Sequence, residues 1–535
     1  PLDTGPVTAE VTLVADPVPD GRGGVTADVR LDGRRLRAHA RRAAASSLDD
    51  RLTGERVLVI GDLQPPGETE WRLRYRHLAG RLEIDTVVGW RTGDPVTRLA
   101  NGLRRTLAQG AEVLSDRHAS LLAGLTLGDV RAQPADMSDA FRAAGMTHLL
   151  AVSGQNVAFV LVLAAPVLSR LRFGPRLVVT LSVLAGFALV WRFEPSVLRA
   201  TAMAAVAATG AALGRPASTL RTLGLGVTGV LLVDPLLATS LAFRLSVVAA
   251  AGIVVGAAPL ERALPGPRWL TVPLAVTVAA QLAVAPLLVA SFGSVPVASL
   301  PANLLAVPAA GPVMIWGLTG GLAAGLSPGT AAAALHVPTL ALLAWIDGVA
   351  AAAARWPLGQ LGASHVIWLA AILVVGLGIR AWSPRGGRWL PALAAVAVLG
   401  HAGVASGGPA VIDGEPLGAG ATLWKGGGAA VLVVDGRARG ETVLAGLRER
   451  GVVRVDLVVL RTPAKAAAEV AGTVRRRWPG TAILAPEGTS RLPDRASIPP
   501  PGSVFDVGGL RLTVVTSSPE RLDVDVGVRG ERARR

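Results

Sequence analysis

Residues 269–346 read WLTVPLAVTVAAQLAVAPLLVASFGSVPVASLPANLLAVPAAGPVMIWGLTGGLAAGLSPGTAAAALHVPTLALLAWI and contain no Asp, Glu, Lys or Arg. A helix needs about 20 mostly apolar residues to cross the hydrocarbon core of a bilayer. These 78 uncharged residues are therefore long enough for about three or four crossings. The stretch decides the fold class, because it predicts a polytopic α-helical membrane protein.

The composition of the whole chain agrees with a membrane protein that carries soluble parts. Only 17% of the 535 residues are charged, with a formal net charge of +15, whereas soluble proteins carry about 25% charged residues. A single soluble enzyme domain is therefore excluded. The absence of cysteine excludes disulfides, thiolate catalysis, iron–sulfur clusters and Cys-ligated zinc.

Hydropathy predicts about ten membrane-spanning helices in the middle of the chain. Some of these segments are short, which leaves re-entrant loops open as an alternative. The predicted spans are 148–169, 176–193, 196–213, 217–234, 242–260, 270–291, 303–325, 330–350, 364–382 and 387–404.

The arginines of the connecting loops predict the orientation. With ten spans, the loops on one side hold ten arginines and those on the other side hold four, and basic loops stay in the cytoplasm. The protein is then expected in the plasma membrane, with both soluble ends outside the cytoplasm. An exported N-terminal domain needs a signal or a preceding membrane helix. Since the chain opens on Pro1-Leu2-Asp3, we expect its natural start to lie further upstream.

Residues 1–95 are expected to form an exported, all-β domain. Short segments that alternate apolar and polar residues, separated by turn residues, predict a small β-barrel or sandwich. The expected strands are Val7–Val14, Gly24–Leu31, Arg56–Ile60, Trp71–Tyr75 and Leu82–Val88.

The next part of the chain changes to a helical period. Within residues 96–145 we expect an amphipathic helix at the membrane interface, over 96–116, followed by a connector. Its apolar face would carry Leu99, Leu103, Leu107 and Leu114. The multi-span block follows at 146–404, and alternating strands and helices predict an α/β domain over 405–535.

Polar side chains inside the apolar block are candidates to line a pore or cleft, because such groups are costly in hydrocarbon. Hydrogen bonding between packed helices is the alternative. For Arg199 we expect the side chain to extend to the interface instead. A Ser153–His336 dyad of an intramembrane hydrolase is a less favoured alternative. The pore-lining candidates are His148, Ser153, Gln155, Asn156, Arg244, Ser246, Gln281 and Asn303.

The run His148–Gly154 (HLLAVSG) is one of several short motifs that follow one another in a particular order. The others are Leu127-Gly128-Asp129, Phe141, Gly145, Pro195–Ala200 (PSVLRA), Asp234-Pro235, Phe243–Ser246 (FRLS), Gln281 with Pro286, Phe292-Gly293 and Asn303–Pro308 (NLLAVP). Over about residues 96–400, these motifs make the chain resemble the ComEC family of bacterial competence proteins.

The resemblance implies an architecture and a function. The architecture is an exported OB-like β domain, a multi-span channel block and an exported metallo-β-lactamase-like domain. The function is a channel for the uptake of single-stranded DNA during natural transformation. Its partners would be single-stranded DNA, the lipid bilayer, a DNA receptor and a cytoplasmic motor or single-strand-binding protein, and a homo-oligomer stays open. The family often has Leu-His after Ser-Gly where this chain has Gln155-Asn156, so no role there can need an imidazole.

The C-terminal domain departs from the ligand pattern that the resemblance implies. Metallo-β-lactamase-like domains place a His-x-Asp-x-Asp-His run after a strand, since their ions need imidazoles and carboxylates. No histidine follows His401 in this chain. We therefore expect a degenerate domain without metal, cofactor or enzymatic activity. Its ligand positions would be Thr462, Ala464, Ala466 and Ala467.

One further group in this domain is a candidate to contact DNA. Arg475, Arg476, Arg477 and Trp478 combine phosphate-binding cations with an aromatic ring, and a solvated helix face is the alternative. No Walker-type phosphate loop is present in the sequence, so the driving force would come from elsewhere. Two other functions stay open: a permease or flippase for another solute and, less favoured, a membrane-tethered nuclease.

Overall fold

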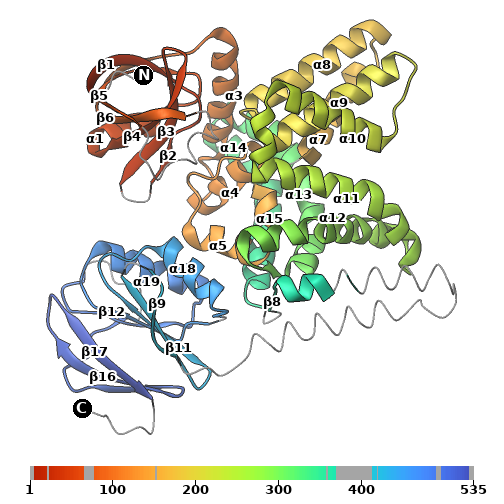
Figure 1. Cartoon of the computed structure of the whole chain (residues 1–535). Helices are drawn as coiled ribbons and strands as arrows, with labels where there is room; N and C mark the ends of the chain where they lie inside the picture. The colour runs from red at the N-terminus through yellow and green to blue at the C-terminus, as the bar shows by residue number, and fades with distance from the viewer. Residues whose placement is uncertain are drawn as a thin grey trace. The chain divides into compact units, whose positions relative to one another are not determined.

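A computed structural model of the chain (Figure 1) describes most of its residues. It divides into two compact units, which we describe separately. The first comprises Pro1–Gln133, His148–Val284 and Val307–Ile346, and the second comprises Pro134–Thr147, Ala285–Ala306 and Asp347–Arg535. The described residues are 5–20, 23–65, 78–150, 154–356, 359–368, 371, 412–418, 420–452, 454–489 and 496–528.

The first unit opens with a closed β-barrel. Five strands close in the order β1-β3-β4-β6-β5, with β5 pairing back to β1. Neighbouring strands run antiparallel except β4 and β6, which are parallel. The short strand β2 pairs with β3. The strands are β1 (Gly5–Leu13), β2 (Val18–Pro19), β3 (Gly24–Leu31), β4 (Arg34–Arg41), β5 (Arg56–Gln64) and β6 (Leu78–Arg91).

The barrel is held by a single apolar core. Inward residues alternate along β4, where Leu36, Ala38 and Ala40 are buried and the intervening Arg37 and His39 are not, as the two-residue period of a strand requires. Helix α1 (Arg42–Asp49) follows β4 and adds Ala44, Ala45 and Leu48 to the same core. The arginine-rich composition of β4 hides this alternation, so the sequence did not predict the strand.

The helices begin after the barrel. Asp94 caps α3 by accepting a hydrogen bond from the Thr97 N–H, and Pro95 occupies its first turn, both of which favour a helix start. The following helices are α3 (Pro95–Ala111), α4 (Asp116–Leu127), α5 (Ala135–Ala143), α6 (Thr147–Leu150), α7 (Gly154–Leu168), α8 (Phe173–Val190), α9 (Pro195–Ala212), α10 (Thr219–Val233), the 3-10 helix η2 (Pro235–Thr239), α11 (Leu241–Ala263), α12 (Arg268–Phe292), α13 (Ser299–Gly325), α14 (Gly329–Leu335) and α15 (Val337–Ala353).

Four of these helices are long and apolar enough to cross a membrane, namely α8, α11, α12 and α13. The bent pair of α14 and α15 makes up to five, and α7 and α10 are shorter apolar helices. The predicted number of ten is thus not reached by length and composition among the described residues. One reason is that α9 carries Arg199 in its second turn. The predicted span 387–404 lies outside the described residues, as does most of 364–382.

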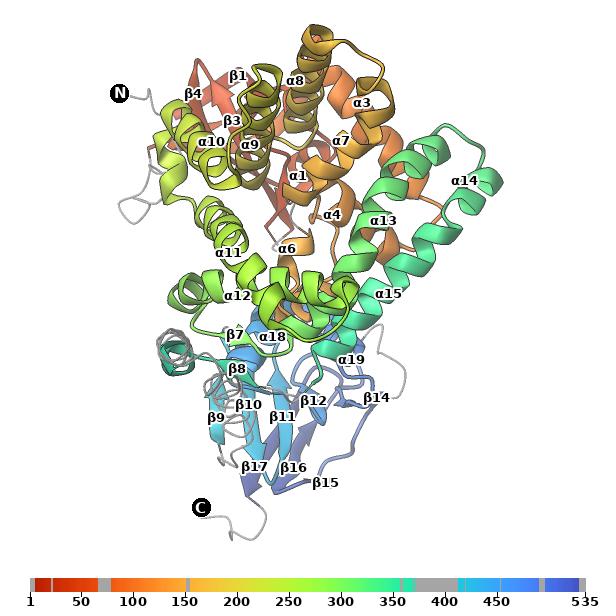
Figure 2. The same cartoon turned by 90° about the vertical axis from the view of Figure 1, so that its right-hand side faces the viewer.

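Helices α7, α8, α9 and α10 pack against one another in the first unit (Figure 2). Their connections follow ordinary capping chemistry, since Ser218 caps α10 and Ser240 caps α11 through their hydroxyls. Helix α10 returns between α9 and α11, so that α9 and α11 run in the same general direction. These two helices also pack against each other.

The second unit contains the C-terminal α/β domain. A six-stranded sheet has the order β14-β13-β12-β11-β10-β9, with β11 to β14 parallel, and a three-stranded antiparallel sheet has the order β15-β16-β17. The elements are β9 (Ile412–Pro416), β10 (Ala421–Gly426), β11 (Ala429–Val434), α18 (Gly440–Glu449), β12 (Leu457–Leu460), α19 (Lys465–Arg477), β13 (Ala482–Leu484), β14 (Ala496–Ser497), β15 (Val504–Val507), β16 (Leu510–Ser517) and β17 (Leu522–Val528).

Alternating side chains give the larger sheet two apolar faces. Leu432 and Val458 pack with residues of α18 and α19 on one face. Val431 and Val459 pack with Leu512 of the smaller sheet on the other. The domain is therefore layered as helices, sheet and sheet. Two short strands, β7 (Val295–Pro296) and β8 (Gln360–Leu361), pair with each other in this unit.

In the N-terminal half, one expected strand is not described, and the expected apolar face of the interfacial helix is buried only in part. The strand expected at Trp71–Tyr75 lies outside the described residues. Helix α3 does form, and it buries the expected leucine face only in part: Leu107 is buried and Leu103 is half-buried, but Leu99 is 77% exposed, whereas Arg104 is 5% exposed. The arginine is turned inward because it finds a carboxylate partner, Asp16.

Candidate functional site

The site centres on Arg199 in the second turn of α9. Its side chain is 8% exposed, so it does not extend to an interface as the sequence predicted. The guanidinium Nε donates a hydrogen bond of 2.8 Å to the Ser246 hydroxyl on α11. Its Nη1 donates to the Met203 sulfur at 3.4 Å. Arg199 thus connects α9 with α11 by a hydrogen bond, and its side chain lies within the helix bundle.

Helix α7 approaches the same guanidinium from another side. A Cβ atom added at Gly154 would lie 2.6 Å from Nη2 of Arg199 and 3.2 Å from the Cβ of Ala200. Real Cβ atoms do not make contacts as short as 2.6 Å. Any residue other than glycine at position 154 would therefore displace the guanidinium. The first residue of α7 therefore forms one wall of the site.

Three separate sequence motifs meet at this point. Gly154 ends the HLLAVSG run, Arg199 and Ala200 belong to PSVLRA, and Ser246 ends FRLS. The sequence identified the motifs and named Ser246, but it missed Arg199 as a member of the site. Its place inside PSVLRA was the available signal.

The other pore-lining candidates lie in different surroundings. His148, Gln155 and Arg244 are exposed, and Arg244 donates to the Ala238 carbonyl at 2.7 Å. Asn156 is buried in the first turn of α7, two residues after Gly154. Gln281 is half-buried in α12, and Ser153 lies outside the described residues. The structure thus brings Ser246 and Arg199 into direct contact and leaves the Ser153–His336 pair undescribed.

Asn303 joins two further motifs, in the second unit. Its Nδ2 donates to the Ser299 carbonyl at 2.7 Å and to the Gly145 carbonyl at 3.4 Å. Gly145 adopts a φ of +65°, and a Cβ there would lie 2.4 Å from the Cβ of Ser299. The contact fixes the turn after α5 against the first turn of α13.

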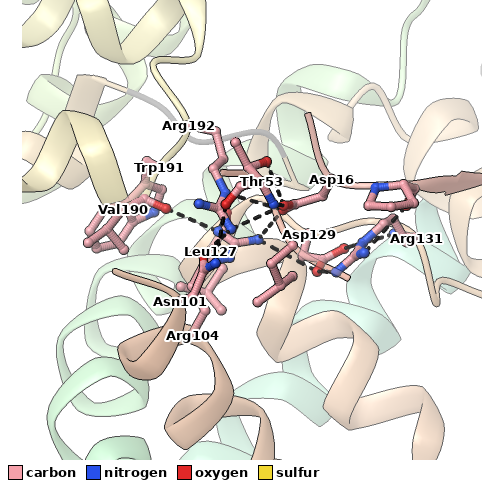
Figure 3. A network of polar contacts seen from close by, with 12 residues as sticks. Asp16, Thr53, Asn101, Arg104, Leu127, Asp129, Arg131, Val190, Trp191 and Arg192 are labelled. Atoms are coloured by element: carbon pink, nitrogen blue, oxygen red, sulfur yellow. Dashed lines mark hydrogen bonds and ion pairs between the residues drawn. The ribbon is translucent and has the colours of Figure 1, made fainter. Parts of the chain in front are cut away.

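A second polar network connects the barrel with the helices of the first unit (Figure 3). The Asp16 carboxylate accepts hydrogen bonds of 2.7 Å from both the N–H and the hydroxyl of Thr53. It also pairs with Arg104 of α3 and with Arg192, each at 3.1 Å. Asp16 therefore binds three parts of the chain that are far apart in sequence.

The electrostatics of this network favour an ionised Asp16. Burial alone would raise the pKa of Asp16, but Arg192, Arg104 and the Thr53 N–H lower it to about 2. Arg192 itself adopts a left-handed φ of +59°, which is unfavourable for a residue with a side chain. Its bonds to Asp16 and to the side-chain Oδ1 of Asn101 offset that strain. Nearby, Asp129 pairs with Arg131 at 2.6 Å.

The arginine triplet of α19 contacts α5 within the second unit. Arg477 pairs with Asp139 at 3.3 Å and donates to the Ala354 carbonyl at 2.6 Å. Arg448 of α18 also pairs with Asp139, and Arg476 pairs with Asp136 at 3.0 Å. These contacts use the side chains that the sequence put forward for DNA.

The remaining members of that group are largely enclosed. Trp478 is buried, with the Arg477 guanidinium 5.2 Å from its ring centre, and Arg475 is half-buried. The Arg476 side chain, at 56% exposed, is the most accessible of the three arginines. In this structure the triplet contributes mainly to contacts within its own unit.

The positions expected to hold metal ligands lie between β12 and the first turn of α19. Thr462 and Ala464 form the loop, and Ala466 and Ala467 lie in the helix. None of these side chains is an imidazole or a carboxylate. Among the described residues, no group of three or more His, Cys, Asp or Glu could hold a metal ion.

One comparison with known proteins gives a match. Residues 125–386, that is 262 of the 535 residues, match the family model described as Competence protein. No curated protein and no solved structure matches the chain. The matched segment contains Gly154, Arg199 and Ser246, so the Arg199 site lies in the part of the chain that is similar to competence proteins.

Proposed function

We propose that the chain forms, or contributes to, a plasma-membrane channel through which single-stranded DNA enters the cell during natural transformation. The carrying observation is that three motifs of the competence-protein domain converge on the buried Arg199. A protein that only anchors soluble domains would not need a cation there, because an ionisable group in an apolar helix bundle is costly. A cation there suits a path for a polyanion.

The soluble parts would receive and orient the strand outside the cytoplasm. We regard the barrel as OB-like, because its closed strand order, the helix after β4 and the parallel β4–β6 pair suit the five-stranded barrels that bind oligonucleotides. We regard the C-terminal domain as a degenerate relative of metallo-β-lactamases. Its layered sheets and helices support that relation, and Thr and Ala at the ligand positions support a role without catalysis.

The driving force would come from partners. These are a DNA receptor on the outside and a cytoplasmic motor or single-strand-binding protein, with a second copy of the chain as a further candidate. A permease or flippase for another solute is the alternative function. In that case the apolar helices would serve a smaller substrate.

Labelled DNA separates the two functions. Cells that lack the gene should bind labelled single strands at their surface as before but should fail to internalise them, and the intact gene should restore entry. Unchanged entry in the deletion strain would refute the channel. Normal DNA entry together with the loss of transport of a small solute would favour the permease.

A further inference from the structure

Arg199 differs from the other buried arginines of the described chain. Arg104, Arg199 and Arg477 are the arginines with buried side chains. Arg104 pairs with Asp16, and Arg477 pairs with Asp139. Within the described ranges, no Asp or Glu pairs with Arg199, which bonds only a hydroxyl and a thioether sulfur. Its charge is therefore left without a counter-anion among those residues.

The guanidinium has unused donor capacity. Arginine carries five N–H donors in a planar fork, and a thioether is a weak acceptor. Nη2, which faces Gly154, donates no hydrogen bond to any residue in the described part of the chain. Gly154 has no side chain, so nothing at this position displaces Nη2.

Ser246 fixes the direction of the fork. Its hydroxyl holds Nε at 2.8 Å, so the guanidinium plane is oriented before any ligand arrives. Gly154 begins α7, and Arg199 and Ser246 lie in the second turns of α9 and α11. All three residues are therefore near helix starts, whose N–H groups add positive potential. An oriented arginine fork is the side chain best suited to the two free oxygens of a phosphodiester.

On this basis, and resting on the proposed channel function, we infer that Arg199 binds the phosphodiester groups of the passing strand and makes the channel select a charged backbone over a neutral one. The Nη groups donate to the phosphate oxygens, and Ser246 positions Nε. A single cation held by neutral neighbours binds each phosphate strongly enough to admit it and weakly enough to release it, as conduction requires.

The test uses the full chain reconstituted in liposomes and two labelled oligonucleotides of one sequence and length. One carries phosphodiester linkages and the other carries uncharged methylphosphonate linkages. The measured quantity is the ratio of charged to neutral uptake, which does not depend on how much channel inserts. Wild-type protein, Arg199→Gln, Arg199→Lys and the control Arg262→Gln are compared. Arg262 is exposed on α11 and donates to the Ala258 carbonyl at 3.1 Å.

We expect wild-type and Arg262→Gln channels to favour the charged strand. Arg199→Gln should lower the ratio about tenfold, as expected for the loss of one charge-assisted hydrogen bond, and Arg199→Lys should restore part of it. An unchanged ratio in Arg199→Gln, with normal wild-type uptake, overturns the inference and leaves the channel function standing. Wild-type liposomes that admit neither strand refute a channel formed by this chain alone, and the inference with it.

A lipid headgroup is the other source of a phosphodiester. Thermal unfolding in liposomes with and without phosphatidylglycerol distinguishes it from the strand. If Arg199→Gln abolishes stabilisation by the anionic lipid while the uptake ratio stays at the wild-type value, Arg199 binds lipid and the inference is overturned. Equal lipid stabilisation in both proteins, together with the lower ratio, supports the strand.

Discussion

Gly154 and Arg199 are in contact across two helices, and a Cβ atom on Gly154 would lie 2.6 Å from the Nη2 of Arg199. The two residues are 45 positions apart in sequence. In the sequence, neither the Ser-Gly pair nor the arginine predicts this contact. In the structure, the contact explains why position 154 is a glycine. The glycine is small because the guanidinium occupies the space that a side chain would need.

Gly154→Ala should therefore weaken DNA uptake by displacing Arg199 from Ser246. The cost in the free energy of unfolding should lie at the low end of the about 1–3 kcal/mol that overpacking causes, because the guanidinium is the far end of a flexible side chain; thermal unfolding in detergent measures it. The ratio of charged to neutral uptake should fall toward the ratio of Arg199→Gln. Gly186→Ala on α8 is the matched control, because nothing lies within 4 Å of its added Cβ. Wild-type uptake and stability in Gly154→Ala would contradict the contact.

The helical part of the fold is predictable from hydropathy to a useful degree. The predicted spans 242–260, 270–291 and 303–325 correspond to α11, α12 and α13, because long uncharged runs have few alternatives. The burial of a charged side chain is not predictable from hydropathy in this way. Whether Arg199 extends to an interface or turns inward depends on which helices meet there, and its place inside PSVLRA marks the residue without showing which way the side chain turns.

The soluble parts show the same limit. The arginine triplet of α19 suggested a DNA contact by its composition alone. Its partners Asp136 and Asp139 lie more than 330 positions earlier in the chain, and no local pattern connects them. Similarly, four arginines conceal the apolar alternation of β4. The role of a charged side chain depends on partners far away in the sequence. The periodicity of a segment predicts only the secondary structure of that segment.

The Asp16 network should contribute strongly to the stability of the first unit. Asp16→Asn leaves Arg104 and Arg192 without their shared carboxylate, and the loss of one partner from a buried ion pair costs about 3–5 kcal/mol. Thermal unfolding of the purified full chain measures the change. Asp85→Asn, on an exposed residue of β6, should have almost no effect. Equal melting temperatures for both variants would rule out a stabilising role for Asp16.

The same carboxylate predicts how stability depends on pH. The pKa of Asp16 is about 2 in the folded protein and about 3.9 in an unfolded chain. The folded state therefore binds fewer protons, and the stabilisation is complete above about pH 4 and is lost as the pH falls toward 2. The difference corresponds to about 2–3 kcal/mol. Melting temperatures from pH 6 to pH 2.5 should fall more steeply for the wild type than for Asp16→Asn, and parallel curves would contradict the assignment.

Asp139 should stabilise the second unit through its two arginines. Asp139→Asn leaves Arg448 and Arg477 without a carboxylate, for which we again expect a loss of about 3–5 kcal/mol. Faster proteolysis in and around α18 and α19 of the full chain should accompany it. Glu469→Gln removes the exposed pair with Lys465 and should cost about 0.5 kcal/mol or less. Similar proteolysis of the two variants would show that Asp139 is dispensable.

The last prediction concerns the positions where relatives would hold metal. Thr462, Ala464, Ala466 and Ala467 offer one hydroxyl and no imidazole or carboxylate, whereas catalytic zinc requires about three protein ligands. Purified full-length protein incubated with zinc or manganese and then desalted should retain much less than one ion per chain. It should not hydrolyse single-stranded DNA with either metal. Stoichiometric retention together with cleavage would show that the domain builds a metal site from other residues, and would favour the tethered nuclease over a non-catalytic domain.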